Sequence, residues 1–227
     1  MIDKIVASPE AALADVPHGA TIMIGGFGNA GMPAALIDAL IAQGASSLTI
    51  VNNNAGNGDR GLAALIKAKR VRKILCSFPR QADSWHFDTL YRAGELVLEL
   101  VPQGTLAERI RAAGAGVGAF YTPTAYGTRL AEGKETRRID GRDYVLEYPV
   151  HADYAIIKAD RADRWGNLTY RKSARNFAPI MAAAAKCTVV QVREIAELGA
   201  LDPESIVTPG IFVRRVVRVV SSLQKAA

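Results

Sequence analysis

The sequence contains little cysteine and histidine, and it has no long apolar run. Its two cysteines, Cys76 and Cys187, each lie in an apolar stretch, which predicts two small buried residues rather than a disulfide, a metal site or a nucleophile. The three histidines, His18, His86 and His151, are far apart and lack ligand spacing, so we expect no bound metal. Because there is no run of 18 apolar residues and no cleavable apolar segment at the amino terminus, we expect a cytoplasmic protein that does not enter a membrane.

Length and composition favour a single α/β domain spanning residues 1–227. With 227 residues, of which 49% are hydrophobic and 22% are charged, the chain can bury a large core. The net charge of +6 would suit a nucleic-acid partner, but lysine and arginine are scattered along the chain. The densest basic cluster, at 214–218, includes two valines and is typical of the solvated face of a strand. We therefore expect no nucleic-acid partner.

Short apolar runs that are typical of strands alternate with helical patterns along the chain. The strand-like runs lie at 47–51, 73–78, 95–101, 153–159 and 187–192, and the helical patterns lie at 62–69, 84–92 and 105–113. This alternation predicts an α/β fold with a mostly parallel open sheet and helices on both faces. In such folds, ligands bind at the carboxyl ends of the strands.

The segment near 126–149 breaks this alternation. It contains three glycines and many charges, and Asp140-Gly141 precedes the run Tyr144, Val145 and Leu146. A turn of this composition before an apolar run is typical of a hairpin. We therefore expect a small antiparallel excursion here, rather than a disordered insert or a second domain.

A glycine-rich turn follows the first predicted strand. The apolar residues 22–24 lead into four glycines, and Pro33 then opens a helical pattern that ends at Gly44. Backbone N–H groups at such a turn can bind an anion or a developing oxyanion, because they lie at the positive end of the helix dipole and glycine permits close approach. The predicted ligand-binding residues are Gly25, Gly26, Phe27, Gly28, Asn29, Ala30 and Gly31. The alternative is a tight turn that binds nothing.

Two other kinds of glycine loop can be compared with this turn. Gly26, Gly28 and Gly31 match the dinucleotide-binding pattern G-x-G-x-x-G, but asparagines at 52–54 stand where an acidic residue should bind the ribose. The missing acid speaks against a nicotinamide-dependent dehydrogenase without excluding it. A phosphate-binding P-loop would close with Gly-Lys followed by Ser or Thr, whereas this turn closes with Gly31-Met32-Pro33. The P-loop is therefore excluded.

The turn resembles that of the alpha subunits of family I CoA-transferases, which carry Gly-Gly-Phe-Gly-x-x-Gly-x-Pro after their first strand. Further similar segments follow in the same order along nearly the whole chain. They lie at 51–56, 100–109, 120–124, 131–135 and 171–177. The resemblance implies a hetero-oligomeric enzyme whose substrate is a coenzyme A (CoA) thioester, with no permanently bound cofactor.

The resemblance also implies where the nucleophile lies. In the family, a glutamate attacks the acyl-CoA carbonyl, and a glutamyl-CoA thioester forms by way of a mixed anhydride. That glutamate belongs to a Ser-Glu-Asn-Gly motif of the beta subunit, and this sequence has no such tetrapeptide. Glu108, Glu132 and Glu135 stand near basic residues and are expected to be solvated or ion-paired. We therefore expect no nucleophile in this chain, and a beta subunit that supplies it in a 2+2 heterotetramer.

Three side-chain amides follow predicted strands and are expected at one crevice. Asn53 and Asn54 come after one strand, and Gln103 comes after another. By resemblance, these three residues match amides that contact substrate in the family. The alternative is that they cap loops or helices by hydrogen bonding to the backbone, as asparagine at a strand end often does.

Arg80 bears on the choice of acceptor. The segment 76–81 resembles family members that act on 3-oxoadipate more than those that act on acetoacetate. A second carboxylate on the acceptor would need a cation, which Arg80 could supply through a bidentate contact. The alternative is a surface arginine at a turn opened by Pro79. The resemblance thus implies transfer of CoA from succinyl-CoA to 3-oxoadipate. Acetoacetate is the alternative acceptor, and a dehydrogenase or a stand-alone ligand-binding regulatory domain are the alternatives from other classes.

Overall fold

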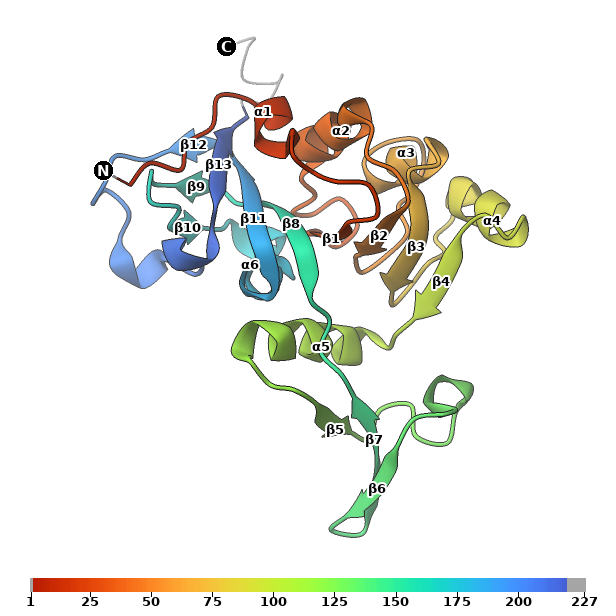
Figure 1. Ribbon diagram of the computed structural model, residues 1–227. Coiled ribbons are helices and arrows are strands. Elements are labelled where there is room, and N and C mark those ends of the chain that lie inside the picture. Colours follow the sequence, from red (N-terminus) through yellow and green to blue (C-terminus); the bar gives the residue numbers. More distant parts are fainter. Residues whose placement is uncertain (1, 220–227) are drawn as a thin grey trace.

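The computed structural model describes residues 2–219, within which the main feature is a sheet of seven strands (Figure 1). The order across the sheet is β13-β11-β8-β1-β2-β3-β4, and all neighbouring pairs are parallel. The strands are β1 (Thr21–Ile24), β2 (Leu48–Val51), β3 (Val71–Cys76), β4 (Val97–Leu100), β8 (Ala152–Lys158), β11 (Ala185–Val192) and β13 (Arg215–Arg218). The predicted parallel open sheet is confirmed.

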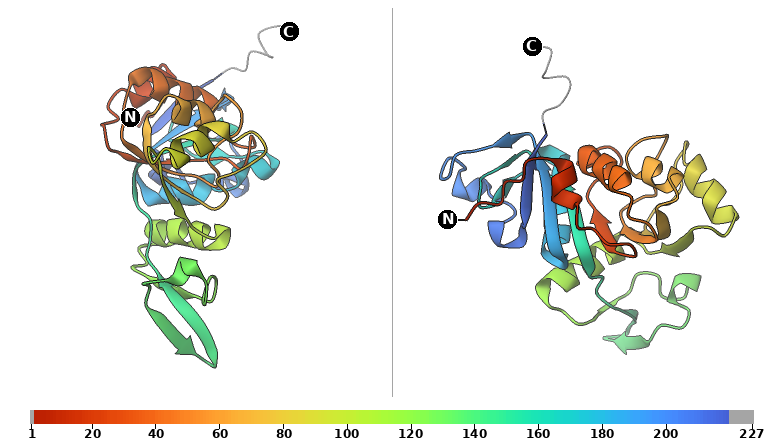
Figure 2. Two further views of the ribbon diagram at one scale, coloured as in Figure 1. Left: turned by 90° about the vertical axis from the view of Figure 1, so that its right-hand side faces the viewer. Right: turned by 45° about the horizontal axis from the view of Figure 1, so that its top comes forward.

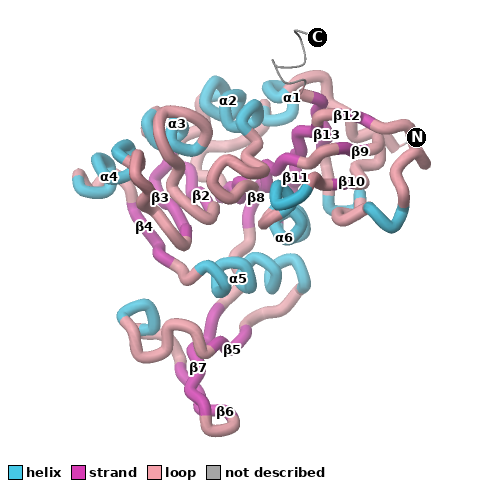
Figure 3. The backbone as a smooth tube through the Cα atoms, turned by 180° about the vertical axis from the view of Figure 1, so that it is seen from behind, coloured by secondary structure: helices cyan, strands magenta, loops and turns pink. Residues whose placement is uncertain are grey.

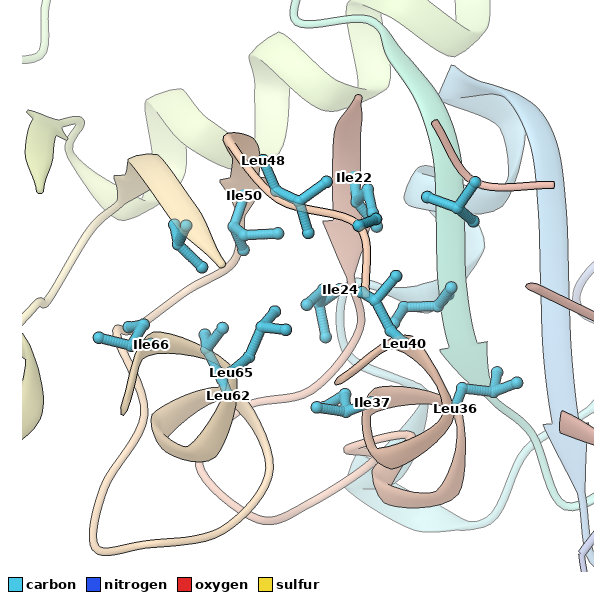
Figure 4. Close-up of a cluster of buried hydrophobic side chains, with 14 of the residues drawn as sticks. Ile22, Ile24, Leu36, Ile37, Leu40, Leu48, Ile50, Leu62, Leu65 and Ile66 are labelled. Atoms are coloured by element: carbon cyan, nitrogen blue, oxygen red, sulfur yellow. The ribbon is translucent and has the colours of Figure 1, made fainter. Parts of the chain in front are cut away.

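Helices cover both faces of the sheet, as predicted. One face carries α1 (Pro9–Leu13), α2 (Ala34–Gln43), α3 (Leu62–Lys67) and α4 (Trp85–Arg92), and the other carries α5 (Gln103–Ala115) and α6 (Ala178–Ala184). Along β1, Ile22 and Ile24 face the first layer, whereas Met23 faces the second. In Figure 4, Ile24 lies close to Ile37 and Leu40 of α2. A strand covered on both faces needs apolar residues at successive positions, which explains the unbroken apolar run.

The chain order reverses between β1 and β8. Strands β1 to β4 add in one direction across the sheet, whereas β8, β11 and β13 add in the other. The loops that leave the carboxyl ends of β1 and β8 therefore diverge, and ligands bind at such a point in open α/β sheets. The first loop contains residues 25–31, called the glycine turn below, and the second runs from 159 to 177.

A small antiparallel sheet projects away from the main sheet (Figure 2). Its strands are β5 (Phe120–Thr122), β6 (Thr136–Ile139) and β7 (Arg142–Glu147). The turn from β6 to β7 has positive φ at Asp140 (+47°) and Gly141 (+78°), as a two-residue hairpin requires. Helix α5 lies between this sheet and the main sheet (Figure 3), and Arg109 of α5 lies 3.9 Å from the buried carboxylate of Glu147. The predicted antiparallel excursion is confirmed.

Some predicted boundaries shift by two residues. The strand expected at 73–78 is β3, which begins earlier because its second residue, Arg72, is exposed and hides the pattern. It also ends earlier, since the chain leaves the sheet before Pro79, which has no N–H for a ladder. The helix expected at 105–113 begins at Gln103, directly after Pro102 in the N-cap position. Gln103 is therefore a helix-opening residue.

Several short elements carry no periodic sequence signal. They are β9 (Arg161–Ala162), β10 (Leu168–Thr169) and β12 (Glu194–Ile195), which form a third sheet, and the 3-10 helices η1 (Arg129–Ala131), η2 (Lys172–Arg175), η3 (Pro203–Ser205) and η4 (Gly210–Phe212). One buried residue is also a correction: Cys76 is buried as expected, but Cys187 is only half-buried, because it lies near the amino end of β11. Over residues 2–219, no helix has the length and apolarity to cross a membrane.

Candidate active site

The glycine turn joins β1 to α2 at the carboxyl edge of the main sheet, where the sequence pattern places it. Phe27 and Ala30 close the turn with two backbone hydrogen bonds, from Phe27 N to Ala30 O (2.9 Å) and from Ala30 N to Phe27 O (3.1 Å). Gly25 N donates to the carbonyl oxygen of Ile156 in β8 (3.0 Å). The turn is thus a closed loop attached to the two central strands.

Three main-chain amides of the turn are left for a ligand. Gly26 N donates to Asn176 Oδ1 (3.2 Å), but within the described part of the chain the amides of Gly28, Asn29 and Gly31 have no acceptor. Gly26, Gly28 and Gly31 have φ of +123°, +56° and +76°, which residues with a Cβ rarely adopt. The free amides lie just before α2, where the helix dipole favours negative charge.

Side-chain amides connect the carboxyl ends of neighbouring strands. Asn52 Nδ2 donates to the carbonyl oxygen of Ile24 (2.6 Å), which joins the ends of β2 and β1. Asn53 Oδ1 accepts from Ser77 Oγ (2.8 Å) and from Gln103 Nε2 (2.8 Å). Asn53 is 4% exposed, so this arrangement lies mostly below the surface. The structure therefore brings the two predicted residues Asn53 and Gln103 into direct contact.

Asn54 and Gln103 are placed differently. Asn54 is buried, its Oδ1 accepts from Gly56 N (2.8 Å), and its Nδ2 is buried with no partner among the described residues. This is the local loop contact that asparagine commonly makes. Gln103 is exposed at the start of α5, and its Oε1 and second Nε2 hydrogen make no contact with the described residues. Gln103 can therefore bind a ligand with both ends of its amide.

Arg80 lies on the loop after β3 and is paired with another residue. Its Nε donates to Asp88 Oδ1 in α4, and the Arg80 side chain is 53% exposed. No hydrogen bond joins Arg80 to Asn53, Asn54 or Gln103 within residues 2–219. The guanidinium would have to leave Asp88, or share it, before binding an acceptor carboxylate.

The segment 171–177 lies directly against the glycine turn, and no chemical motif in the sequence points to this contact. A Cβ placed on Gly31 would lie 2.4 Å from the carbonyl oxygen of Ala174. A cavity of about 670 Å³ lies between the two segments. Its lining residues are Phe27, Ala30, Tyr170, Lys172, Ser173, Arg175, Asn176 and Val207. The lining has two cations and no carboxylate, so the cavity suits an anionic ligand.

The described residues around the crevice do not offer an activated nucleophile. Cys76, at the end of β3, is buried, and burial raises the pKa of its thiol to about 12. Glu108 pairs with Arg111 (2.8 Å) on the exposed side of α5. Nowhere in residues 2–219 does a glutamate side chain hydrogen-bond to the glycine turn or to Gln103. The same residues contain no cluster of His, Cys, Asp or Glu that could hold a metal ion.

The chain matches the family model of the Coenzyme A transferases over residues 6–219. It is 65% identical to the A-type subunit of 3-oxoadipate CoA-transferase from Pseudomonas putida, over the full length of both chains. It is 51% identical to the A-type subunit of succinyl-CoA:3-ketoacid coenzyme A transferase from Xanthomonas campestris pv. campestris (strain B100), over 94% of this chain and 88% of that one. The structure of glutaconate coenzyme A-transferase from Acidaminococcus fermentans has the same fold, with a TM-score of 0.85 and 23% identity over 96% of this chain and 76% of that one. This chain belongs to the coenzyme A transferase family.

Proposed function

We propose that this chain is the alpha subunit of a transferase that moves CoA from succinyl-CoA to 3-oxoadipate. The relative with 65% identity carries that acceptor in its name. The observation that carries the proposal is the amide-rich crevice, in which Asn53 holds Gln103 and the described residues include no activated nucleophile. Such a site can bind and orient a carboxylate or a carbonyl, but it needs an attacking group from another chain.

The chain's part in the reaction is binding and stabilisation. A glutamate of the beta subunit makes the attack on the acyl carbon of succinyl-CoA, and the carbonyl oxygen becomes an oxyanion as the new C–O bond forms. The amides of Gly28, Asn29 and Gly31 receive this oxyanion, where one well-placed donor lowers the barrier by about 3 to 4 kcal/mol. The CoA thiolate leaves, then attacks the glutamyl carbonyl of the mixed anhydride, and succinate departs. The acceptor acid repeats these steps in reverse.

Gln103 orients the reacting carboxylate or carbonyl. Asn53 Oδ1 accepts one Nε2 hydrogen of Gln103, which fixes the plane of the amide, and the second hydrogen points to the substrate in this proposal. Asn54 acts indirectly, because its Oδ1 orders the loop after β2 through Gly56 N. Arg80 binds the distal carboxylate of the acceptor after exchanging its contact with Asp88.

A partner chain completes the site. The relatives are named as one of the subunits of their enzymes, which supports a second kind of chain, the beta subunit, that brings the glutamate. We infer a 2+2 heterotetramer in which residues 1–227 act as one domain. The cation-lined cavity beside Phe27 gives the chain a place for the anionic part of the CoA thioester.

The test is the turnover of the purified chain with and without the beta subunit. The chain alone should not transfer CoA, because none of its glutamates stands in the nucleophile motif. The co-expressed pair should transfer CoA from succinyl-CoA to 3-oxoadipate. Turnover by a preparation shown to be free of the beta subunit would contradict the proposal and would direct attention to Glu108 and Glu132.

Acetoacetate is the second candidate acceptor, because relatives at about half identity are named succinyl-CoA:3-ketoacid transferases. A panel of 3-oxoadipate and acetoacetate with the co-expressed pair decides between them through kcat/KM. A nicotinamide-dependent dehydrogenase is disfavoured by Asn52, which is buried and donates to the carbonyl oxygen of Ile24 where an acid should bind ribose. Titration with NAD and with CoA checks this point.

A further inference from the structure

Asn176 uses all the hydrogen-bonding capacity of its side chain between the glycine turn and the segment 171–177. Its Oδ1 accepts from Gly26 N (3.2 Å) and from Phe177 N (2.8 Å). Its Nδ2 donates to the carbonyl oxygens of Ala30 (2.9 Å) and Ser173 (3.0 Å). An asparagine side chain has two acceptor lone pairs and two donor hydrogens, so none remains for a substrate. Asn176 therefore connects two segments and does not itself bind the reacting groups.

The backbone at Asn176 is strained. Its φ is +20° with ψ of −117°, a combination that is uncommon for a residue with a Cβ. Such conformations persist where the surrounding contacts determine them, and they cluster at functional sites. Helix α6 begins two residues later at Ala178, which is fully buried. The rigid core thus determines where the Asn176 side chain stands.

The two contacts with the turn lie on either side of its tip. Gly26 and Ala30 flank the residues that carry free amides, Gly28 and Asn29, and Asn176 holds both flanks. The partner that fixes this local loop lies 150 positions away in the sequence. Without it, the backbone bonds between residues 27 and 30 could keep the loop closed but could not fix its orientation against the sheet.

We propose that Asn176 is a positioning residue for CoA transfer, which holds the glycine turn so that its free amides meet the oxyanion. The inference rests on the function proposed above for the turn. Donors stabilise a transition state best when they are in place before the charge develops. A misplacement of about 1 Å can cost about 100-fold in rate.

A merely structural role would give a different result. If Asn176 only orders the start of α6, its removal should lower the melting temperature and leave kcat of the folded complex unchanged. Asn167 provides a matched control outside the lining of the cavity. Its Oδ1 accepts from Gly210 N (2.8 Å), and its Nδ2 donates to Asp163 Oδ2 (2.7 Å).

The experiment uses the complex with the beta subunit in which this chain carries Asn176→Ala, Asn176→Gly or Asn167→Ala. The glycine variant loses the same hydrogen bonds but tolerates the positive φ, so it separates the side chain from the backbone strain and guards against a variant that does not fold. We expect both Asn176 variants to lower kcat about 100-fold and to change KM for succinyl-CoA less than about threefold. Asn167→Ala should lower the melting temperature and keep kcat near that of the wild type.

Hydrogen exchange gives a second readout that does not depend on activity. In Asn176→Gly, the amides of residues 25–31 should exchange faster than in the wild type, and Asn167→Ala should leave them unchanged. Unchanged exchange in the turn, or a loss of kcat no larger than that of Asn167→Ala, overturns the positioning role. If the wild-type complex transfers no CoA, the proposed function fails and the positioning role fails with it, whereas the exchange result still decides whether Asn176 holds the turn.

Discussion

Gln103 Nε2 donates a hydrogen bond to Asn53 Oδ1 over 2.8 Å, although the two residues stand 50 positions apart. Asn53 follows β2, and Gln103 opens α5 after β4. Strand β3 lies between β2 and β4 in the sheet, and Ser77 at its end donates to the same oxygen. Residues from three neighbouring strand ends thus meet at one atom, which holds the Gln103 amide at the crevice.

Replacement of Gln103 by alanine should lower kcat/KM in both half-reactions. Loss of a neutral hydrogen bond costs about 0.5 to 1.5 kcal/mol, and a partner left buried and unpaired raises this to about 3 kcal/mol. We therefore expect a decrease of about 3-fold to 150-fold, with tetramer assembly and melting temperature nearly unchanged. Gln43→Ala is the control, because Gln43 Nε2 donates to Val16 O (2.9 Å) at the far end of α2. Wild-type kcat/KM in both half-reactions would refute the role, and failed assembly would reassign Gln103 to holding the loop.

Valine at Gly28 should abolish turnover while leaving the fold largely intact. Gly28 has φ of +56° and open space around a Cβ, and Gly19, at the opposite end of β1, has φ of +78° and the same open space. Both valine variants carry similar backbone strain, so their melting temperatures should fall by similar amounts. Only Gly28→Val should lose kcat, because it blocks the approach to the free amides.

Gly26→Val should also abolish turnover, although its cause differs, since a Cβ there would lie 3.2 Å from Met32 Cα. Activity is measured beside thermal melting and binding of the beta subunit. Near-normal rates in a soluble Gly28→Val variant would mean that the turn is only structural.

Arg80→Ala should separate the two acceptors. If Arg80 binds the distal carboxylate, its loss removes a charge-assisted contact of about 1.5 to 3 kcal/mol, which corresponds to about 10-fold to 150-fold in kcat/KM for 3-oxoadipate. The rate with acetoacetate, which has no second carboxylate, should not change. Asp88→Asn is the control, because it frees the guanidinium and should not impair 3-oxoadipate turnover. An equal effect on both acceptors would assign Arg80 to the surface turn.

Glu99 should make stability depend on pH in the acidic range. Burial raises the pKa of Glu99, but hydrogen bonds from Lys73 and Arg109 outweigh it and hold the pKa below the usual value. Because the folded pKa is lower than the unfolded one, which is about 4.3, the ionised group stabilises the fold above that pH and loses this effect as the pH falls through the folded pKa. Glu99→Gln should therefore lower the melting temperature at pH 7 more than at about pH 3.

The control for this prediction is Glu95→Gln, because Glu95 pairs with Lys69 at the surface, where both side chains are largely exposed. Such a pair contributes little to stability, so its loss should matter less than that of Glu99 at neutral pH. Equal shifts for Glu99→Gln at both pH values would contradict the assignment of Glu99 as the titrating group.

The sequence alone was sufficient for the unit formed by β1, the glycine turn and α2, and for the alternation of strands and helices. These features depend on residues that are neighbours in the chain: an apolar run, glycines that permit positive φ, and Pro33 before a helical repeat. The hairpin at Asp140 and Gly141 is local in the same sense. Boundaries shifted where an exposed residue such as Arg72 interrupted the pattern at the rim of the sheet.

Which distant side chains meet was decided only by the tertiary structure. Local patterns place Asn53, Gln103 and Asn176 after or before separate elements, but they do not give the order of the strands. That order puts β8 beside β1, which brings Asn176 onto the glycine turn, and it puts β3 between β2 and β4, which brings Gln103 to Asn53. The physical reason is that strand order follows from burying both faces of the sheet at once, so it depends on the whole core rather than on any one segment.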